Sequence, residues 1–153
     1  METKLIKKLI NAAPTVYPED FSPETRNGWY DILLKVGLAL HQMNIANDWT
    51  EPLVAGQVKE KFGTLRWYIN PTNGNMEAAQ KIIREAEHQS AKTCEYCGKP
   101  GKLRKRFWFK TLCVEHALED EKITSEEAAK ELLDSTPGNA DQKIGLDSLI
   151  KAG

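Results

Sequence analysis

Apolar residues recur at helical spacing in three stretches of the chain. The first stretch ends before Pro14, because proline stops a helix, and the second is longer and should form the main core helix. Residues 16–27 between them are rich in Pro, Asp, Glu and Ser and are predicted to form a loop. The third stretch follows Asn75, a residue type that often caps a helix. The apolar positions are Leu5, Ile6, Leu9 and Ile10; then Trp29, Ile32, Leu33, Val36, Leu40 and Met43; then Ala79, Ile82, Ile83 and Ala86.

Between residues 53 and 69 the apolar period changes from helical to alternating. Every second residue from Leu65 to Ile69 is apolar, which is typical of a strand with one buried face. The connection formed by residues 60–63 ends in Gly63, which can take a left-handed turn conformation. The segment is therefore predicted to form a β-hairpin, and together with the helices it predicts an α+β fold.

The three cysteines of the chain fall into a pattern typical of metal ligands. Cys94 and Cys97 form a Cys-x-x-Cys pair that is followed by glycine, and Cys113 and His116 form a second pair after a gap of fifteen residues. Two such pairs can provide four ligands for one tetrahedral Zn²⁺. Because four protein ligands would fill the coordination shell, we expect a structural ion and assign no catalytic residue.

This arrangement resembles a treble-clef zinc finger over residues 92–120. The resemblance implies a zinc knuckle at the first cysteine pair, a β-hairpin after it, and a helix whose first turn carries the second pair of ligands. Treble clefs occur in proteins of many unrelated functions, so the resemblance does not indicate a function. The nuclease members carry an active-site histidine near the knuckle, and residues 92–99 contain none.

A second resemblance covers residues 57–117. The run Val58-Lys-Glu-Lys-Phe-Gly-Thr-Leu-Arg-Trp-Tyr68, followed by a helix and the cysteine motif, looks like small uncharacterised proteins of phages and bacteria. This resemblance implies a phage or bacterial origin, and it does not imply any activity.

Basic and acidic residues are distributed unevenly along the chain, although its net charge is only −1. Residues 98–112 hold six basic residues and no acidic one, whereas residues 114–153 hold ten acidic residues and four lysines. Thr124 and Glu127 have the spacing of a capping box and predict a helix in the acidic part. We therefore expect an α+β core over residues 1–91, a zinc module over 92–120 and an acidic helical tail over 121–153.

The chain shows no signal-peptide pattern and no apolar run of the length that a membrane span requires. With a Cys-x-x-Cys pair that is more typical of a metal site than of a disulfide, this predicts a cytoplasmic protein, in a bacterium or a phage-infected cell. Oligomeric state is left open by the sequence.

Clustered cations and aromatic residues make the predicted second hairpin the main binding candidate. Cations can neutralise phosphates and exposed aromatic rings can stack on unpaired bases, so the segment predicts nucleic-acid binding. The competing interpretation is structural, with Phe107 and Phe109 in the core of the zinc module, Trp108 covering it and the cations solvated. The candidate residues are Lys102, Arg104, Lys105, Arg106, Trp108 and Lys110.

Two other functions stay open. The basic hairpin could instead bind an acidic surface of a partner protein, as a regulatory or inhibitory protein would, or the chain's own acidic tail. Alternatively, Glu60, Lys61, Arg66 and Tyr68 around the first hairpin could line a pocket for a small acidic ligand or a nucleotide, in a binder or an enzyme. No nucleophile and base occur at a spacing that would favour the enzyme.

Overall fold

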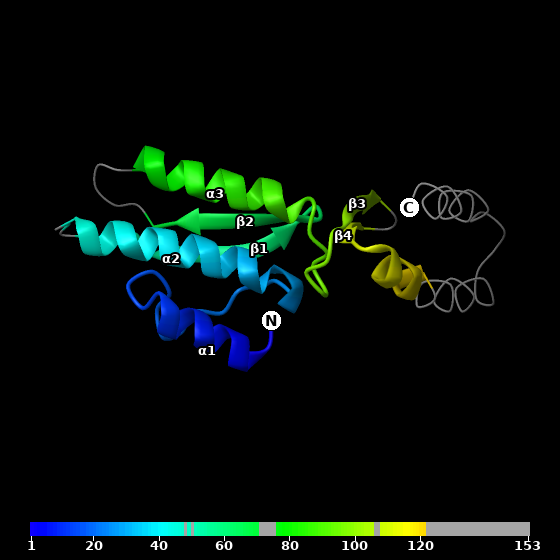
Figure 1. Ribbon diagram of the computed structural model, residues 1–153, viewed down its shortest axis with the longest axis horizontal. Helices are drawn as coiled ribbons and strands as arrows, with labels where there is room; N and C mark the ends of the chain where they lie inside the picture. Colours follow the sequence, from blue (N-terminus) through cyan, green and yellow to red (C-terminus); the bar gives the residue numbers. More distant parts are fainter. Residues whose placement is uncertain (48, 50, 71–75, 106–107, 122–153) are drawn as a thin grey trace, which may run out of the picture.

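The computed structural model describes residues 1–47, 49, 51–70, 76–105 and 108–121. Within these ranges the chain forms α-helices, a short 3₁₀ helix and two antiparallel hairpins, which confirms a mixed α and β fold (Figure 1). The chain is helical again from residue 114 to residue 121, where the described part ends. The other elements are α1 (Thr3–Ala12), η1 (Asn27–Trp29), α2 (Tyr30–Ala46), β1 (Ala55–Lys61), β2 (Thr64–Ile69), α3 (Met76–Ser90), β3 (Lys102–Lys105) and β4 (Phe109–Leu112).

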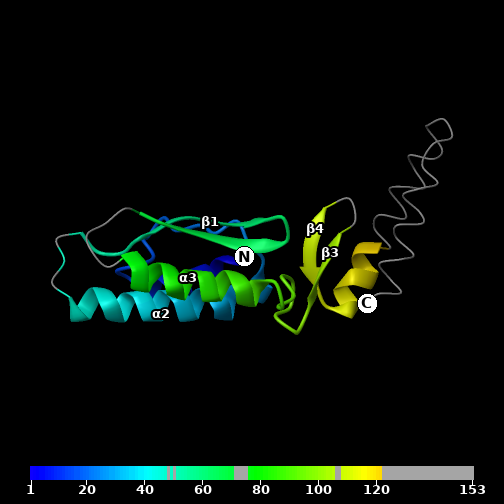
Figure 2. The same cartoon turned by 90° about the horizontal axis from the view of Figure 1, so that it is seen from above.

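Helices α2 and α3 run side by side along one face of the β1–β2 hairpin (Figure 2). Helix α1 packs against α2, and α3 packs against β2. The predicted apolar faces meet between these elements, where Leu33, Leu65 and Ile83 are among the fully or almost fully buried side chains. The described residues between 1 and 91, called the helical body below, thus share one hydrophobic core.

The turn between β1 and β2 has two residues, because Lys61 pairs directly with Thr64. Phe62 and Gly63 have φ angles of +54° and +81°, so both lie in the left-handed region that suits a tight hairpin turn. The glycine was predicted for this conformation. Phe62 was not, because a bulky residue rarely adopts it. Its ring is 63% exposed, so core packing does not account for its position.

The helical body meets residues 92–120, called the metal module below, through a backbone contact at Gly28. The N–H of Gly28 donates to the carbonyl oxygen of Glu95 at 2.7 Å, and the indole Nε1 of Trp29 donates to the carbonyl oxygen of Thr93 at 2.9 Å. A Cβ atom on Gly28 would lie 2.1 Å from the carbonyl oxygen of Cys94. Only glycine therefore allows this approach.

A second contact joins the turn of the first hairpin to the side of the second. The hydroxyl of Thr111 donates to the carbonyl oxygen of Gly63 at 2.7 Å, and Leu103 packs against Gly63 so closely that a Cβ there would lie 2.4 Å from its Cδ1 atom. The two hairpins, distant in sequence, are therefore held together at Gly63.

The cap predicted at Asn75 and the tail helix predicted to begin near Thr124 lie outside the described residues. In the described part of the chain, no helix is both long enough and apolar enough to cross a bilayer.

Gly28→Ala should destabilise the protein, because the new methyl group overlaps the backbone of the metal module. Overpacking of this kind typically costs about 1–3 kcal/mol, and we expect a loss in the free energy of unfolding at the upper end of that range. Chemical denaturation followed by circular dichroism would measure it. Gln42→Ala, at an exposed position of α2, is the control and should change stability little. Equal stability of the two variants would contradict the tight contact.

Candidate metal centre and adjoining cavity

Cys94, Cys97, Cys113 and His116 come together and are positioned to bind one metal ion. Their ligand atoms all lie within 4.8 Å of one another. The Sγ atom of Cys113 lies 3.2 Å from Nδ1 of His116 and 3.7 Å from Sγ of Cys97. Metal–sulfur bonds of about 2.3 Å and metal–nitrogen bonds of about 2.0–2.1 Å give tetrahedral edges of roughly 3.5–3.8 Å, so the donor set fits a small tetrahedral ion.

The local backbone explains how the first pair of cysteines faces one point. The N–H of Gly98 donates to the carbonyl oxygen of Cys94 at 2.9 Å, and the N–H of Cys94 donates to the carbonyl oxygen of Lys99 at 2.8 Å. Gly98 adopts a φ of +80°, which closes the turn behind the two sulfur atoms. The other two ligands lie at the start of the helix that begins at residue 114, three residues apart and on one side of it.

The thiols differ in acidity. Burial raises the pKa of Cys113, but hydrogen bonds from the backbone N–H and the side chain of His116 outweigh this effect and lower it to about 7. Desolvation, together with the neighbouring thiols of Cys94 and Cys113, raises the pKa of Cys97 to about 11. Thiolates this close repel one another, so a bound cation is required to hold all three in the deprotonated form.

A stack of three side chains extends from the metal ligands to the surface of the helical body. The ring of Tyr96 lies parallel to that of His116, with centroids 5.3 Å apart, and the guanidinium of Arg26 lies 4.5 Å from the centre of the Tyr96 ring. The Nε2 atom of His116 is 4.0 Å from a carboxylate oxygen of Glu119.

The residues predicted for the basic hairpin occupy different environments. Lys102 and Lys105 are exposed on β3, and Trp108 is 75% exposed. In contrast, Arg104 is half-buried and its Nε donates to the carbonyl oxygen of Leu112 at 3.1 Å. Lys110 is also half-buried, and its Nζ lies 2.7 Å from a carboxylate oxygen of Asp120. Arg106 and Phe107 lie outside the described residues.

Where the two hairpins meet, three aromatic side chains gather at the surface: Phe62, Trp108 and Phe109. The rings of Phe62 and Phe109 meet edge to face with centroids 6.3 Å apart. Lys61 lies over the ring of Phe62 and Lys105 over that of Phe109, with Nζ atoms 5.5 Å and 5.6 Å from the ring centres. We call these five residues the aromatic junction.

The aromatic junction borders a cavity of about 900 Å³. Its walls come from residue 1, residues 23–26, residues 60–62, the knuckle residues Glu95 and Tyr96, and residues 108–110. Both halves of the molecule therefore contribute to it. Of the pocket predicted around the first hairpin, Glu60 and Lys61 line this cavity, whereas Arg66 and Tyr68 do not. Arg66 instead donates to Thr64 at 2.6 Å, and Tyr68 is exposed.

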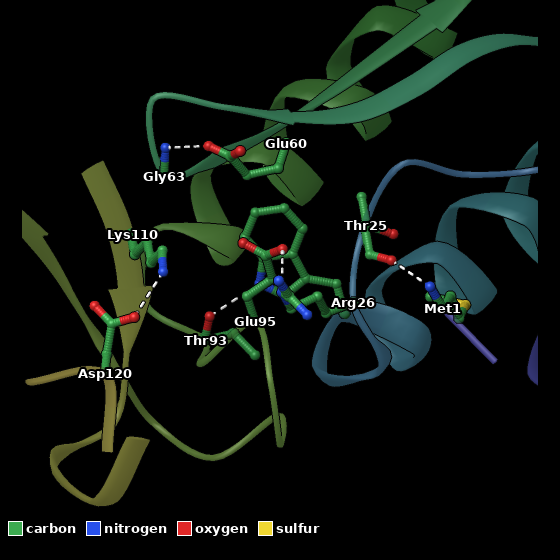
Figure 3. Close-up of polar contacts among 10 residues, drawn as sticks. Met1, Thr25, Arg26, Glu60, Gly63, Thr93, Glu95, Lys110 and Asp120 are labelled. Carbon is green, nitrogen blue, oxygen red and sulfur yellow. Dashed lines mark hydrogen bonds and ion pairs between the residues drawn. The ribbon is translucent and has the colours of Figure 1, made fainter. Parts of the chain in front are cut away.

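Glu95 is a buried carboxylate in the wall of this cavity, with a side chain only 9% exposed. Figure 3 shows it between Arg26, Glu60 and Lys110. Burial, with a smaller contribution from the carboxylate of Glu60, raises its pKa to about 7 in spite of the nearby cations Arg26 and Lys110, which lower it. Glu60 is held differently, because one of its carboxylate oxygens accepts a hydrogen bond from the N–H of Gly63 at 2.7 Å.

Three functional candidates were missed from the sequence: Arg26, Phe62 and Glu95. Phe62 carries a usable signal, since a large aromatic residue immediately before a turn glycine is unusual. The sequence signal at Glu95 is weaker: it is an acidic residue between two cysteines of the predicted metal site. Arg26 lies in a predicted loop, and nothing in its local sequence indicates that it approaches the knuckle.

A comparison with protein families, curated proteins and solved structures finds no match to this chain. The resemblances to treble-clef fingers and to small phage and bacterial proteins thus remain predictions.

Loss of one ligand should remove the metal and loosen the metal module. Cys113→Ser and His116→Asn should each lower metal content well below one ion per chain, and proteolysis should increase after residue 90. A structural ion of this kind contributes about 10–16 kcal/mol of binding free energy at neutral pH, so its loss affects folding. Metal content by mass spectrometry and limited proteolysis would measure both effects.

His88→Asn provides the matched control, because His88 is an exposed histidine at the end of α3, outside the cluster. It should keep both the metal and the resistance to proteolysis. If Cys113→Ser retained one tightly bound ion per chain, the proposed ligand set would be wrong.

Proposed function

We propose that this protein binds single-stranded nucleic acid at the aromatic junction, on a scaffold stabilised by one structural Zn²⁺. The observation that carries the proposal is the gathering of exposed aromatic rings and lysines where two hairpins meet. Phe62 is 63% and Trp108 75% exposed. Exposed rings of this kind stack on unpaired bases, and lysines beside them attract the phosphates that connect those bases.

The exposure of these rings favours binding over the structural interpretation. If Trp108 served to cover the core of the metal module, most of its surface would be buried, whereas three quarters of it faces solvent. Phe62 also adopts a backbone conformation unfavourable for a bulky residue. Unfavourable backbone conformations and exposed apolar surface both concentrate at binding sites.

The lysines of the junction favour nucleic acid over an acidic protein surface. Neither Lys61 nor Lys105 has an ion-pair partner within the described part of the chain. Each is close enough to a ring for one ligand to contact both, which suits the alternation of base and phosphate along a single strand.

Zinc is the metal that best suits three cysteines and one histidine at tetrahedral spacing. With all four positions filled by the protein, no site for an activated water remains, so the proposed role of the ion is structural. A knuckle, a hairpin and a helix that starts beside the second pair of ligands support the treble-clef interpretation. In this function the ion would hold β3 and β4, and hence Trp108, in place.

Fluorescence anisotropy with labelled single-stranded DNA and RNA over a range of salt concentrations tests the proposal. Trp108→Ala should weaken binding by about tenfold, since loss of one stacked base costs about 1–3 kcal/mol. The double variant Lys61→Glu, Lys105→Glu should also weaken binding. It should reduce the salt dependence, with the slope of log K against log salt falling in magnitude by roughly 0.7 for each lost phosphate contact.

Lys81→Glu is the control, because it reverses one exposed charge on α3, away from the junction. It should bind almost as the unchanged protein does. Absence of salt-dependent binding by the unchanged, metal-loaded protein would refute the proposal and favour a protein partner. Binding that is unaffected by Trp108→Ala and by the double variant would place the nucleic acid elsewhere.

A further inference from the structure

The cavity beside the aromatic junction contains a carboxylate that lacks a hydrogen-bond partner. The carboxylate of Glu95 has Arg26 as its polar contact, at 3.9 Å from Nε, which is beyond hydrogen-bond distance. No hydrogen bond to this carboxylate occurs within the described part of the chain. A largely buried carboxylate normally has hydrogen-bond partners, so the cavity favours a ligand that supplies them.

The position of Glu95 is set by its own backbone. Its N–H donates to the carbonyl oxygen of Thr111 at 3.0 Å, and its carbonyl oxygen accepts from Gly28 at 2.7 Å. These bonds attach it to β4 on one side and to the helical body on the other. The backbone that carries the carboxylate is therefore fixed, and burial limits the directions that the side chain can take.

The walls of the cavity indicate the shape of the ligand. Among the lining residues, Trp108, Phe109 and Phe62 provide flat apolar faces and Glu95 provides carboxylate acceptors. A flat ring with N–H donors along one edge would satisfy both. The lining carries charges of both signs, with Arg26, Lys61 and Lys110 beside Glu24, Glu60 and Glu95, so a ligand with both donors and acceptors suits it. A volume of about 900 Å³ leaves room for a nucleotide.

We infer that this cavity accepts an unpaired guanine base of the bound strand and that Glu95 recognises its Watson–Crick edge. The inference rests on the proposed function. Guanine is the base with two adjacent donors on that edge, at N1 and at the N2 amino group, and a carboxylate can accept both together. Adenine and cytosine offer one amino group beside an acceptor, and thymine offers one N–H between two carbonyl oxygens. Arg26 provides N–H donors for the O6 atom of guanine.

The experiment varies one base in an otherwise uniform strand. Labelled deoxythymidine oligonucleotides with a single central guanine, adenine, cytosine or hypoxanthine are titrated with the metal-loaded protein. The guanine strand should bind about tenfold more tightly than the others, since a bidentate pair discriminates by roughly 1–3 kcal/mol. Hypoxanthine lacks the amino group at position 2 and keeps N1–H, so it should lose most of that advantage.

Glu95→Gln should remove the preference for guanine while binding to the uniform thymidine strand persists. Glu77→Gln makes the same chemical change at an exposed position of α3 and should keep the preference. Metal content and melting temperature confirm that each variant is folded. If Glu95→Gln does not fold, the comparison of the guanine strand with the hypoxanthine strand in the unchanged protein still tests whether the cavity recognises guanine.

Guanosine and adenosine monophosphate, titrated by calorimetry, test the cavity without a strand. Equal affinity for all strands, with no selective binding of guanosine monophosphate, would overturn the inference and leave the proposed function standing. Failure of every strand to bind, with selective and Glu95-dependent binding of guanosine monophosphate, would overturn the proposed function and retain the guanine site. Failure of strands and mononucleotides alike would overturn both.

Discussion

The hydrogen bond from the N–H of Gly28 to the carbonyl oxygen of Glu95 joins the two halves of the molecule, and most of the surface described above depends on it. It brings the start of α2 against the metal-binding knuckle with no side chain between the two backbones. From Glu95 the connection continues to Thr111 on β4, and from Thr111 to Gly63 in the turn of the first hairpin. The cavity and the aromatic junction lie along this series of contacts.

In this arrangement, the side chains that stabilise each half differ from the exposed side chains that are proposed to bind a ligand. The helical body is held by apolar side chains between α2, α3 and the β1–β2 hairpin, and it contains no ligand of the metal cluster. The metal module has a small apolar cluster around Leu112 and two of the metal-binding cysteines, so a bound ion would replace the hydrophobic core that so short a segment cannot form. Residues exposed at the boundary can then be selected for binding, because neither half needs them for its core.

Local sequence patterns predicted the parts of the fold that depend on local periodicity. The apolar spacing of α2 and α3 reflects the face that each helix buries, and the alternation from Leu65 to Ile69 reflects the pleat of β2. The cluster of Cys94, Cys97, Cys113 and His116 was also predictable, since two close pairs of ligand residues require only short, fixed spacings. Gly63 was predicted for its turn because glycine accepts a positive φ at little cost.

The tertiary contacts could not be predicted in the same way. Gly28 is needed because residues 94 and 95 approach it, and nothing within its own helix start requires glycine. Arg26 lies over Tyr96, some seventy positions along the chain, and neither residue's neighbours indicate the pairing. Arg104 and Lys110 belong to a basic run, yet one binds a carbonyl oxygen and the other an aspartate. A count of charges cannot distinguish such cations from free ones.

The stack of Arg26, Tyr96 and His116 has a thermodynamic consequence. Tyr96 lines the cavity with one part of its surface and packs on a metal ligand with another. A ligand that ordered Tyr96 would therefore also order His116, and a metal that fixed His116 would prepare the wall of the cavity. Linkage makes this effect reciprocal: the factor by which the ion raises affinity for the ligand equals the factor by which the ligand raises affinity for the ion. The supply of metal would then control the fraction of the protein that carries a ligand in the cavity, as well as the fraction that is folded.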